Sequence, residues 1–174
     1  MKPWEKLAEH RVFDGWRKIK EVEYALPDGK RDMFQIKEEG DCVVALVLTR
    51  DRQVVLARQY RVGPEMVLLE MPGGGISVGE HPKDAIAREI LEETGYVCGK
   101  IEHVATLFQC AYSTRRHLVF VGTNAEWRQG PDGDDAEFCE AVLLSVDAFR
   151  AHLRTGQLTD VDAGYLALDH LGLL

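Results

Sequence analysis

Three glutamates fall close together in one predicted helix. Pro82 suits the first position of a helix and Gly95 suits the residue just past its end, so the sequence predicts a helix between them. At about 100° per residue, Glu89, Glu92 and Glu93 fall within one arc of about 100°, largely opposite an apolar stripe. Glu89 and Glu93 are one turn apart, roughly 6 Å along the axis. Such a like-charged pair is mildly destabilising unless a cation lies between the carboxylates.

The residues around these glutamates also favour a metal site. Ligands that are all oxygen select a hard cation, magnesium or manganese, rather than zinc or copper. The glycines Gly73–Gly75 precede the helix and let the backbone approach such an ion, so that a carbonyl can be a further ligand. Arg88 lies one turn before Glu92 and can pair with it, or with Glu80 in the preceding loop. Several glutamates on a helix more often form a solvated face than a metal site. The residues around them must therefore distinguish the two.

The pattern over residues 74–96 resembles the signature of the Nudix hydrolase family. It reads G-x5-E-x7-R-E-U-x-E-E-x-G-U, in which Ile90 and Tyr96 occupy the two positions marked U. Seven positions are fixed identities. At an average usage of about 7% each, a chance match occurs on the order of once in 10⁸ starting points. By this resemblance the chain is identified as a member of the family.

The resemblance implies a role for each matching residue. The implied metal ligands are three carboxylates and one backbone carbonyl, those of Glu89, Glu92, Glu93 and Gly73. Glu92 and Glu93 are also implied to be catalytic, whereas Glu80 and Arg88 are implied to pair and support the loop. The implied reaction is attack of water at phosphorus. It requires neutralised phosphate oxygens and a water made nucleophilic near neutral pH, and divalent ions supply both.

Segments outside the signature resemble the ADP-ribose pyrophosphatase and nucleoside-diphosphate-sugar branch of the family. They are the N-terminal VEYALPDGKRDMFQI, the lead-in segments LARQYR and LLEMPGG, and the later acidic GDDAEFCEAV. The branch implies a magnesium-dependent hydrolase, with manganese as the other candidate metal. It would cleave the diphosphate linkage of a nucleoside diphosphate sugar such as ADP-ribose, giving a nucleoside monophosphate and a sugar phosphate.

The same resemblance suggests residues that contact the substrate. Arg61 would hold a phosphate, for which a planar guanidinium is well shaped, and Glu70 lies in the same lead-in. Trp16 would stack on the base from the same face of a first strand as Tyr24, with packing inside an N-terminal sheet as the alternative. Glu137 matches an acidic loop that positions or deprotonates the attacking water. Its neighbour Glu140 is an alternative base, and both could equally be solvated charges.

One segment differs from the usual sequence of this branch, so other functions remain alternatives. ADP-ribose enzymes commonly carry a Ser-Pro-Gly turn beyond the signature, whereas residues 111–116 read AYSTRR. A tyrosine near this position recurs in diadenosine polyphosphate hydrolases, so dinucleoside polyphosphates remain an alternative substrate. A non-catalytic nucleotide-binding module is a second alternative, although such modules often lose a signature glutamate. Isopentenyl diphosphate isomerase shares the fold but needs a catalytic cysteine, and no cysteine here has a matching context.

The other segments predict a mixed α+β fold around the glutamate helix. The continuous apolar run over residues 43–48 is typical of a strand covered on both faces. Residues 16–26 and 31–37 flank a Pro-Asp-Gly turn, which predicts a hairpin. Two helices are expected near residues 146–154 and 160–171. Together with the resemblance, these elements predict an α/β/α sandwich with a mixed sheet and an N-terminal antiparallel extension.

The predicted domain organisation has two parts. Residues 1–40 would form the β-extension, and residues 41–174 would form the Nudix domain. A hairpin alone is too small to be stable and must pack on something. In the resembling branch that partner is a second subunit, so we expect a homodimer.

The amino-acid composition restricts the kinds of partner that this chain is expected to bind. The formal net charge of −8 argues against a nucleic-acid backbone, because such binders normally carry a basic face. It does not exclude an anionic small molecule bound through metal. The four cysteines are widely spaced without a CxxC pair, as expected of a reduced cytoplasmic protein. No run of about 18 apolar residues occurs, so no membrane span is expected.

Overall fold

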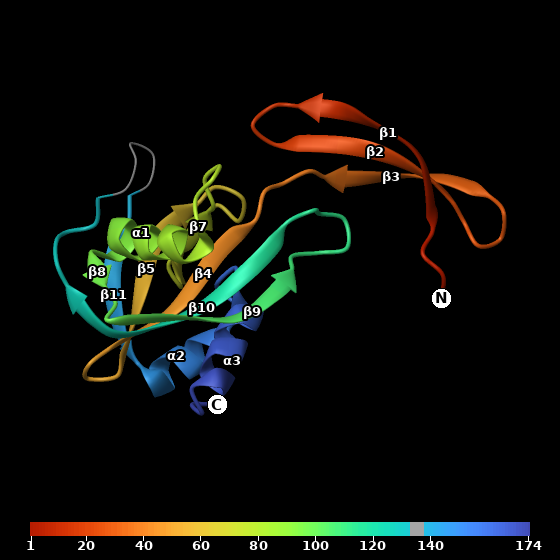
Figure 1. The fold of residues 1–174 in the computed structure, drawn as a ribbon. Helices are drawn as coiled ribbons and strands as arrows, with labels where there is room; N and C mark the ends of the chain where they lie inside the picture. Colours follow the sequence, from red (N-terminus) through yellow and green to blue (C-terminus); the bar gives the residue numbers. More distant parts are fainter. Residues whose placement is uncertain (133–137) are drawn as a thin grey trace. The chain divides into compact units, whose positions relative to one another are not determined.

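The computed structural model describes residues 1–132 and 138–174, which divide into two compact units (Figure 1). The smaller unit comprises residues 1–41 and 108–116. The larger unit comprises residues 42–107 and 117–174 and contains the glutamate helix. The sequence predicted a division after residue 40 but gave no sign that residues 108–116 cluster with the N-terminal segment, because that grouping depends on tertiary contacts.

The smaller unit is built on a three-stranded antiparallel sheet in the order β1-β2-β3 (Figure 1). Its strands are β1 (Glu5–Asp14), β2 (Lys18–Ala25) and β3 (Arg31–Lys37). The predicted hairpin is β2–β3, and its turn contains Gly29 at a φ of 84°, a conformation that favours glycine. Strand β1 was not predicted. All ten of its residues are exposed, so it has no buried face to produce an alternating pattern.

Three aromatic rings pack on one another in this sheet. The ring centroids of Trp4, Tyr24 and Phe34 lie 5.7 to 6.2 Å apart, within the usual range for aromatic pairs. The expectation that Trp16 shares a strand face with Tyr24 is wrong. Trp16 lies in the turn between β1 and β2 and is 89% exposed. Its ring lies under the guanidinium of Arg17, 4.3 Å from the ring centroid, rather than in the aromatic cluster.

The larger unit contains a mixed sheet in the order β11-β5-β4-β10-β8, with β6 paired to β5, β7 to β4 and β9 to β10. The strands are β4 (Cys42–Thr49), β5 (Gln53–Arg61), β6 (Met66–Glu70), β7 (Gly73–Gly75), β8 (Tyr96–Val97), β9 (Lys100–Phe108), β10 (Arg116–Trp127) and β11 (Glu140–Ser145). Strands β4 and β10 run parallel, whereas β4 is antiparallel to β5. The sheet is therefore mixed, as predicted.

Strand β4 is covered on both faces by helices. Its odd-numbered residues 43–47 pack with buried residues of α1 (Pro82–Thr94). Its even-numbered residues 44–48 pack with α2 (Val146–Leu153) and α3 (Val161–His170) on the other face (Figure 1). The predicted α/β/α sandwich is confirmed. The glutamate helix forms one outer layer by itself, not the centre of the domain.

The bounds of α1 follow from the signals at its two ends. The ring of His81 caps the first turn by accepting a hydrogen bond from the backbone N–H of Lys83 at 3.2 Å. Gly95 ends the helix with a φ of 74°, and its N–H donates to the carbonyl of Leu91 at 2.8 Å. A side chain at Gly95 would also clash with the backbone of Gln129. Glycine is therefore required here for two reasons.

The structure also bears on the expectations about membrane spans and cysteines. In the part of the chain that is described, no helix has both the length and the hydropathy needed to cross a bilayer. All four cysteines lie in that part, and none of them forms a disulfide there. The thiol of Cys98 is mostly buried, and burial raises its pKa to about 11 because the thiolate would lose its hydration.

Candidate catalytic site

Two buried carboxylates of α1 face a glycine backbone. Glu89 and Glu93 are only 8% and 3% exposed. The backbone N–H of Gly73 donates to Oε2 of Glu93 at 3.0 Å, and a Cβ on Gly74 would clash with the carboxylate of Glu89. The sequence predicted close backbone approach at these glycines. The structure gives the physical reason at Gly74, where a side chain would displace the carboxylate of Glu89.

The glycine segment is held in place as a short strand. Strand β7 pairs antiparallel with the first residues of β4, and the N–H of Ala45 donates to the carbonyl of Pro72 at 3.0 Å. A Cβ on Gly73 would clash with the backbone of Val43. The buried strand β4 therefore fixes the backbone against which the two carboxylates pack.

Arg88 connects the loop to the glutamates. Its guanidinium donates to Glu80 through Nε at 3.0 Å and through an Nη at 3.2 Å. It also donates to Glu89 and Glu92, at 2.9 Å each, and to the carbonyl of Gly75 at 3.2 Å. The sequence offered pairing with Glu92 or with Glu80, and the structure contains both pairs. The bond to Glu89 was not foreseen, since neighbouring residues on a helix do not usually face each other.

The contacts of Arg88 change the pKa of Glu80 in the loop before α1. The Arg88 guanidinium, helped by the backbone N–H of Ser77, lowers the pKa of Glu80 to about 2. The carboxylates around Arg88, Glu80 first among them, raise the pKa of the guanidinium. Both groups are therefore charged at neutral pH, and the ion pair between them persists into acid.

Arg61 is held by a buried glutamate. Its Nε donates to Oε2 of Glu70, which is 1% exposed. The other oxygen of Glu70 accepts two bonds from Thr159, from the hydroxyl at 2.6 Å and from the backbone N–H at 3.1 Å. Burial alone would lower the pKa of Arg61, but the bond and charge of Glu70 raise it. Glu70 is thus placed to orient Arg61. Its predicted role in substrate binding stays a prediction.

Gln59 is a polar neighbour of the site that the sequence did not reveal. It is 6% exposed, and its amide nitrogen lies 3.5 Å from Oε1 of Glu93. Its amide oxygen lies 3.8 Å from the thiol of Cys139. The run of β5 that contains Gln59 is mostly apolar, so only its position inside LARQYR could have distinguished it.

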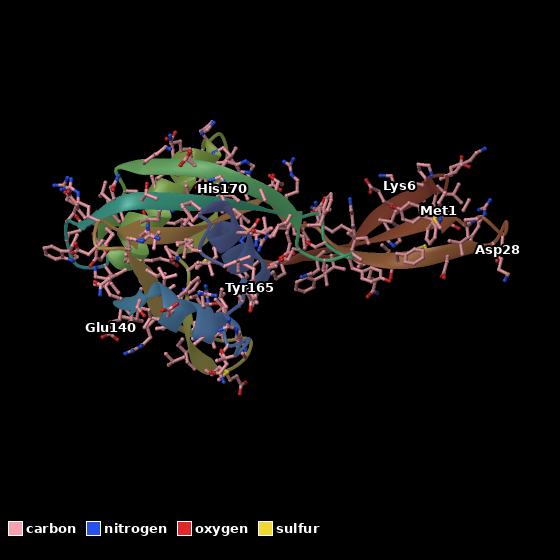
Figure 2. All side chains as sticks on the ribbon, turned by 90° about the horizontal axis from the view of Figure 1, so that it is seen from below. Met1, Lys6, Asp28, Glu140, Tyr165 and His170 are labelled. Atoms are coloured by element: carbon pink, nitrogen blue, oxygen red, sulfur yellow. The ribbon has the colours of Figure 1, made fainter. Side chains whose placement is uncertain are left out.

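The other residues considered from the sequence lie in separate parts of the chain. Glu137 lies outside the described residues. Glu140 points outward from β11 (Figure 2) and pairs at 3.0 Å with Arg58, its cross-strand neighbour. In the smaller unit, Arg115 donates to the carbonyl of Gly40 and Arg116 pairs with Asp41. These two arginines therefore connect segments of that unit.

Comparison with known proteins shows the family to which this chain belongs. The sequence profile described as NUDIX domain matches residues 39–162, well over half of the chain. The chain belongs to the Nudix family. The ADP-ribose pyrophosphatase of Bacillus subtilis (strain 168) is 25% identical over 173 residues, covering 96% of this chain and 91% of the relative. The ADP-sugar pyrophosphatase of Mus musculus is 29% identical over 193 residues, covering 94% and 86%.

A solved structure agrees on the architecture. The crystal structure described as an ADP compounds hydrolase aligns with a TM-score of 0.83 at 20% identity, covering 100% of this chain and 98% of the other. At that identity the likeness shows the shared Nudix fold. Together with the relatives, it confirms the resemblance to the ADP-ribose pyrophosphatase branch and the prediction of a Nudix pyrophosphohydrolase.

The donors at this Nudix site suit a hard divalent cation. Glu89, Glu92 and Glu93 offer carboxylate oxygens, and the glycine backbone at Gly73 carries no side chain that would block an ion. Two buried like charges on one helix turn also gain from a cation between them. Among the described residues, no three acidic, histidine or cysteine side chains are already gathered around a single point.

The Glu80–Arg88 pair generates a pH-dependent prediction. Because the folded pKa of Glu80 is depressed to about 2 from its ordinary 4.5, the pair stabilises the fold fully above about pH 4.5. That contribution is lost as the pH falls toward 2. We expect Glu80→Gln to lower the urea midpoint at pH 7, and the difference from wild type to shrink steadily between pH 5 and pH 3.

The matched control for this measurement is Glu126→Gln. Glu126 is partly exposed and pairs with Arg50 in the same unit, so its loss should change stability by no more than about 0.5 kcal/mol at pH 7. A Glu80→Gln difference that stayed constant from pH 7 to pH 3 would show that the ion pair is not the source of the stability.

Proposed function

We propose that the protein hydrolyses the diphosphate linkage of nucleoside diphosphate sugars, releasing a nucleoside monophosphate and a sugar phosphate. ADP-ribose or an ADP-sugar is expected among the better substrates. The observation that carries the proposal is the buried pair Glu89 and Glu93 packed against the glycine backbone inside an intact Nudix signature. The names of the ADP-ribose and ADP-sugar pyrophosphatase relatives support the substrate class.

In this proposal each part of the site has a separate task. Magnesium or manganese held by Glu89, Glu92, Glu93 and the Gly73 carbonyl supplies charge neutralisation and a more acidic water. Arg61 holds one phosphate, because a guanidinium matches the geometry of phosphate oxygens and stays charged. Removal of the proton from the attacking water is assigned to Glu137 from the sequence, with Glu140 or one of the signature glutamates as the alternative.

The supporting residues keep these groups preorganised. Arg88 fixes the orientation of Glu89 and Glu92 by direct hydrogen bonds. The N–H of Gly73 fixes one oxygen of Glu93. Donors and charges that are already in place cost no reorganisation when charge develops on the phosphate, which is the main source of catalysis at such sites.

We further propose that the protein is a cytoplasmic homodimer. Every residue of β1 is exposed, and the sheet that contains it has little core of its own. Four exposed apolar residues of the N-terminal segment suit a second subunit, namely Trp4, Leu7, Val12 and Phe13. Trp16, also exposed, would stack on the base near the seam between subunits.

Glu93→Gln should nearly abolish turnover while the protein remains folded. The substitution removes charge with little change of shape, so we expect kcat to fall at least roughly a hundredfold. Stability without metal should change little, because relieved repulsion with Glu89 is offset by the loss of one of the two acceptors that face Gly73 and Gln59. Glu102→Gln, at an exposed glutamate paired with Lys100, is the control and should keep turnover within about twofold of wild type. Near wild-type turnover of Glu93→Gln in magnesium would refute the metal role.

The substrate class is tested by comparing kcat/KM in magnesium for several compounds. The panel is ADP-ribose, ADP-glucose, GDP-mannose, a diadenosine polyphosphate and a nucleoside triphosphate. We expect activity on several diphosphate sugars, because aromatic stacking discriminates weakly between bases. A preference of roughly tenfold or more for the polyphosphate or the triphosphate, about 1.4 kcal/mol, would overturn the assignment. Binding without turnover of any of them would indicate a non-catalytic module.

Sedimentation velocity tests the homodimer. The full-length protein should sediment as a dimer at micromolar concentration, and deletion of residues 1–37 should give a poorly soluble chain or a monomer with weakened substrate binding. A full-length protein that sediments as a monomer under these conditions would contradict the proposal.

A further inference from the structure

A chain of polar contacts centred on the buried Glu70 runs from the start of α3 to Arg61. Thr159 lies two residues before the helix, and its hydroxyl and backbone N–H both donate to Oε1 of Glu70. The opposite oxygen, Oε2, accepts from Nε of Arg61. Thr159 and Glu70 are 89 positions apart in the sequence. The C-terminal segment thus reaches the residue that holds the proposed phosphate ligand.

Glu70 depends on these bonds because water hardly reaches it. At 1% exposure its carboxylate has lost its hydration, which is costly unless protein donors replace the water. Thr159 supplies two of the donors and Arg61 supplies the compensating charge. Removing the hydroxyl of Thr159 would leave a buried acceptor partly unsatisfied, and the carboxylate could then turn away from the orientation that Arg61 uses.

The hydrogen bond from Arg61 to Glu70 leaves the two terminal nitrogens of the guanidinium available for a ligand. Among the described residues, Nε is the atom of Arg61 that bonds Glu70, and the two terminal nitrogens make no hydrogen bond. The side chain is 34% exposed. A guanidinium fixed through Nε has a defined plane, so its terminal nitrogens can be aimed at two phosphate oxygens at once.

The residue that follows Thr159 ties the start of α3 to the sheet. Its hydroxyl lies 3.2 Å from Oδ2 of Asp160, and Oδ1 of Asp160 lies 3.4 Å from Nδ1 of His117 on β10. The hydroxyl carries one hydrogen, and the shorter contact of 2.6 Å is to Glu70. The start of α3 is therefore attached to the sheet beside the point where Thr159 meets Glu70.

We propose that Thr159 is a positioning residue for phosphate binding, acting on Arg61 through Glu70. The proposal rests on the phosphate-binding role of Arg61 in the proposed function. Thr159 itself does not touch the substrate. Its contribution is the orientation of the arginine, so its effect should appear in substrate binding and should depend on Arg61 being present.

Thr159→Val and Thr159→Ser form a matched pair for the test. Valine keeps the shape and the backbone N–H but lacks the hydroxyl, whereas serine keeps the hydroxyl. Thr159 is exposed, so neither change should prevent folding. We expect Thr159→Val to raise KM for ADP-ribose about three- to tenfold with kcat within about twofold, because uniform binding of the phosphate is weakened. Thr159→Ser should match wild type.

A double-mutant cycle with Arg61→Gln separates positioning from a general structural effect. Arg61→Gln alone should raise KM more than Thr159→Val does, and adding Thr159→Val to it should change KM by less than about twofold. Equal effects of Thr159→Val in the two backgrounds would overturn the proposal. An unchanged KM in Thr159→Val alone would also overturn it.

Arginine side-chain NMR gives a readout that needs no turnover. In the substrate-free protein, the Nε–H of Arg61 should exchange with water slowly in wild type and Thr159→Ser, and at least roughly fivefold faster in Thr159→Val, because the bond to Glu70 is loosened. Unchanged exchange in Thr159→Val would overturn the proposal even if ADP-ribose were not hydrolysed. Faster exchange in a protein that hydrolyses no diphosphate sugar would support the link from Thr159 to Arg61 and count against the proposed function alone.

Discussion

The site depends on packing two buried carboxylates against backbone that has no side chains. Glu89 and Glu93 are like charges on one turn of a helix, almost wholly removed from water. This arrangement is unfavourable unless donors and cations compensate it. The glycine strand β7 allows that compensation, because its N–H reaches Glu93 and the absent Cβ of Gly74 makes room for Glu89. A side chain at Gly73 would clash with the backbone of β4, and one at Gly74 would clash with the carboxylate of Glu89.

Two arginines compensate this negative charge in different ways. All three guanidinium nitrogens of Arg88 donate to carboxylates or to a carbonyl, so the whole group serves the protein. Arg61 donates to Glu70 through Nε, and its terminal nitrogens make no hydrogen bond to the described residues. The same side chain type thus maintains the structure in one place and, in the proposed function, offers a binding group in the other. The difference arises from the number of acceptors around each.

The sequence predicted what is local and repetitive. The helix from Pro82 to Thr94 was recoverable because its capping signals and its apolar stripe agree, and the run that forms β4 was recoverable because burial on both faces leaves no polar alternation. Strand β1 was missed because exposure removes that alternation. The contacts of Thr159 with Glu70, and of Gln59 with Glu93, were missed because each joins distant segments through only one pair of residues. Such pairs leave no periodic pattern in a single sequence.

The double burial of β4 limits how this strand can change during evolution. Its odd-numbered residues support the glutamate helix, and its even-numbered residues support the two C-terminal helices. A strand with a solvent face can vary every second residue without consequence, but this one has no such neutral positions. Divergence in β4 should then proceed by exchanges that conserve volume among small aliphatic residues, with compensating changes in the helix opposite. The strand that contributes no reactive group would thereby change more slowly than many surface residues near the substrate.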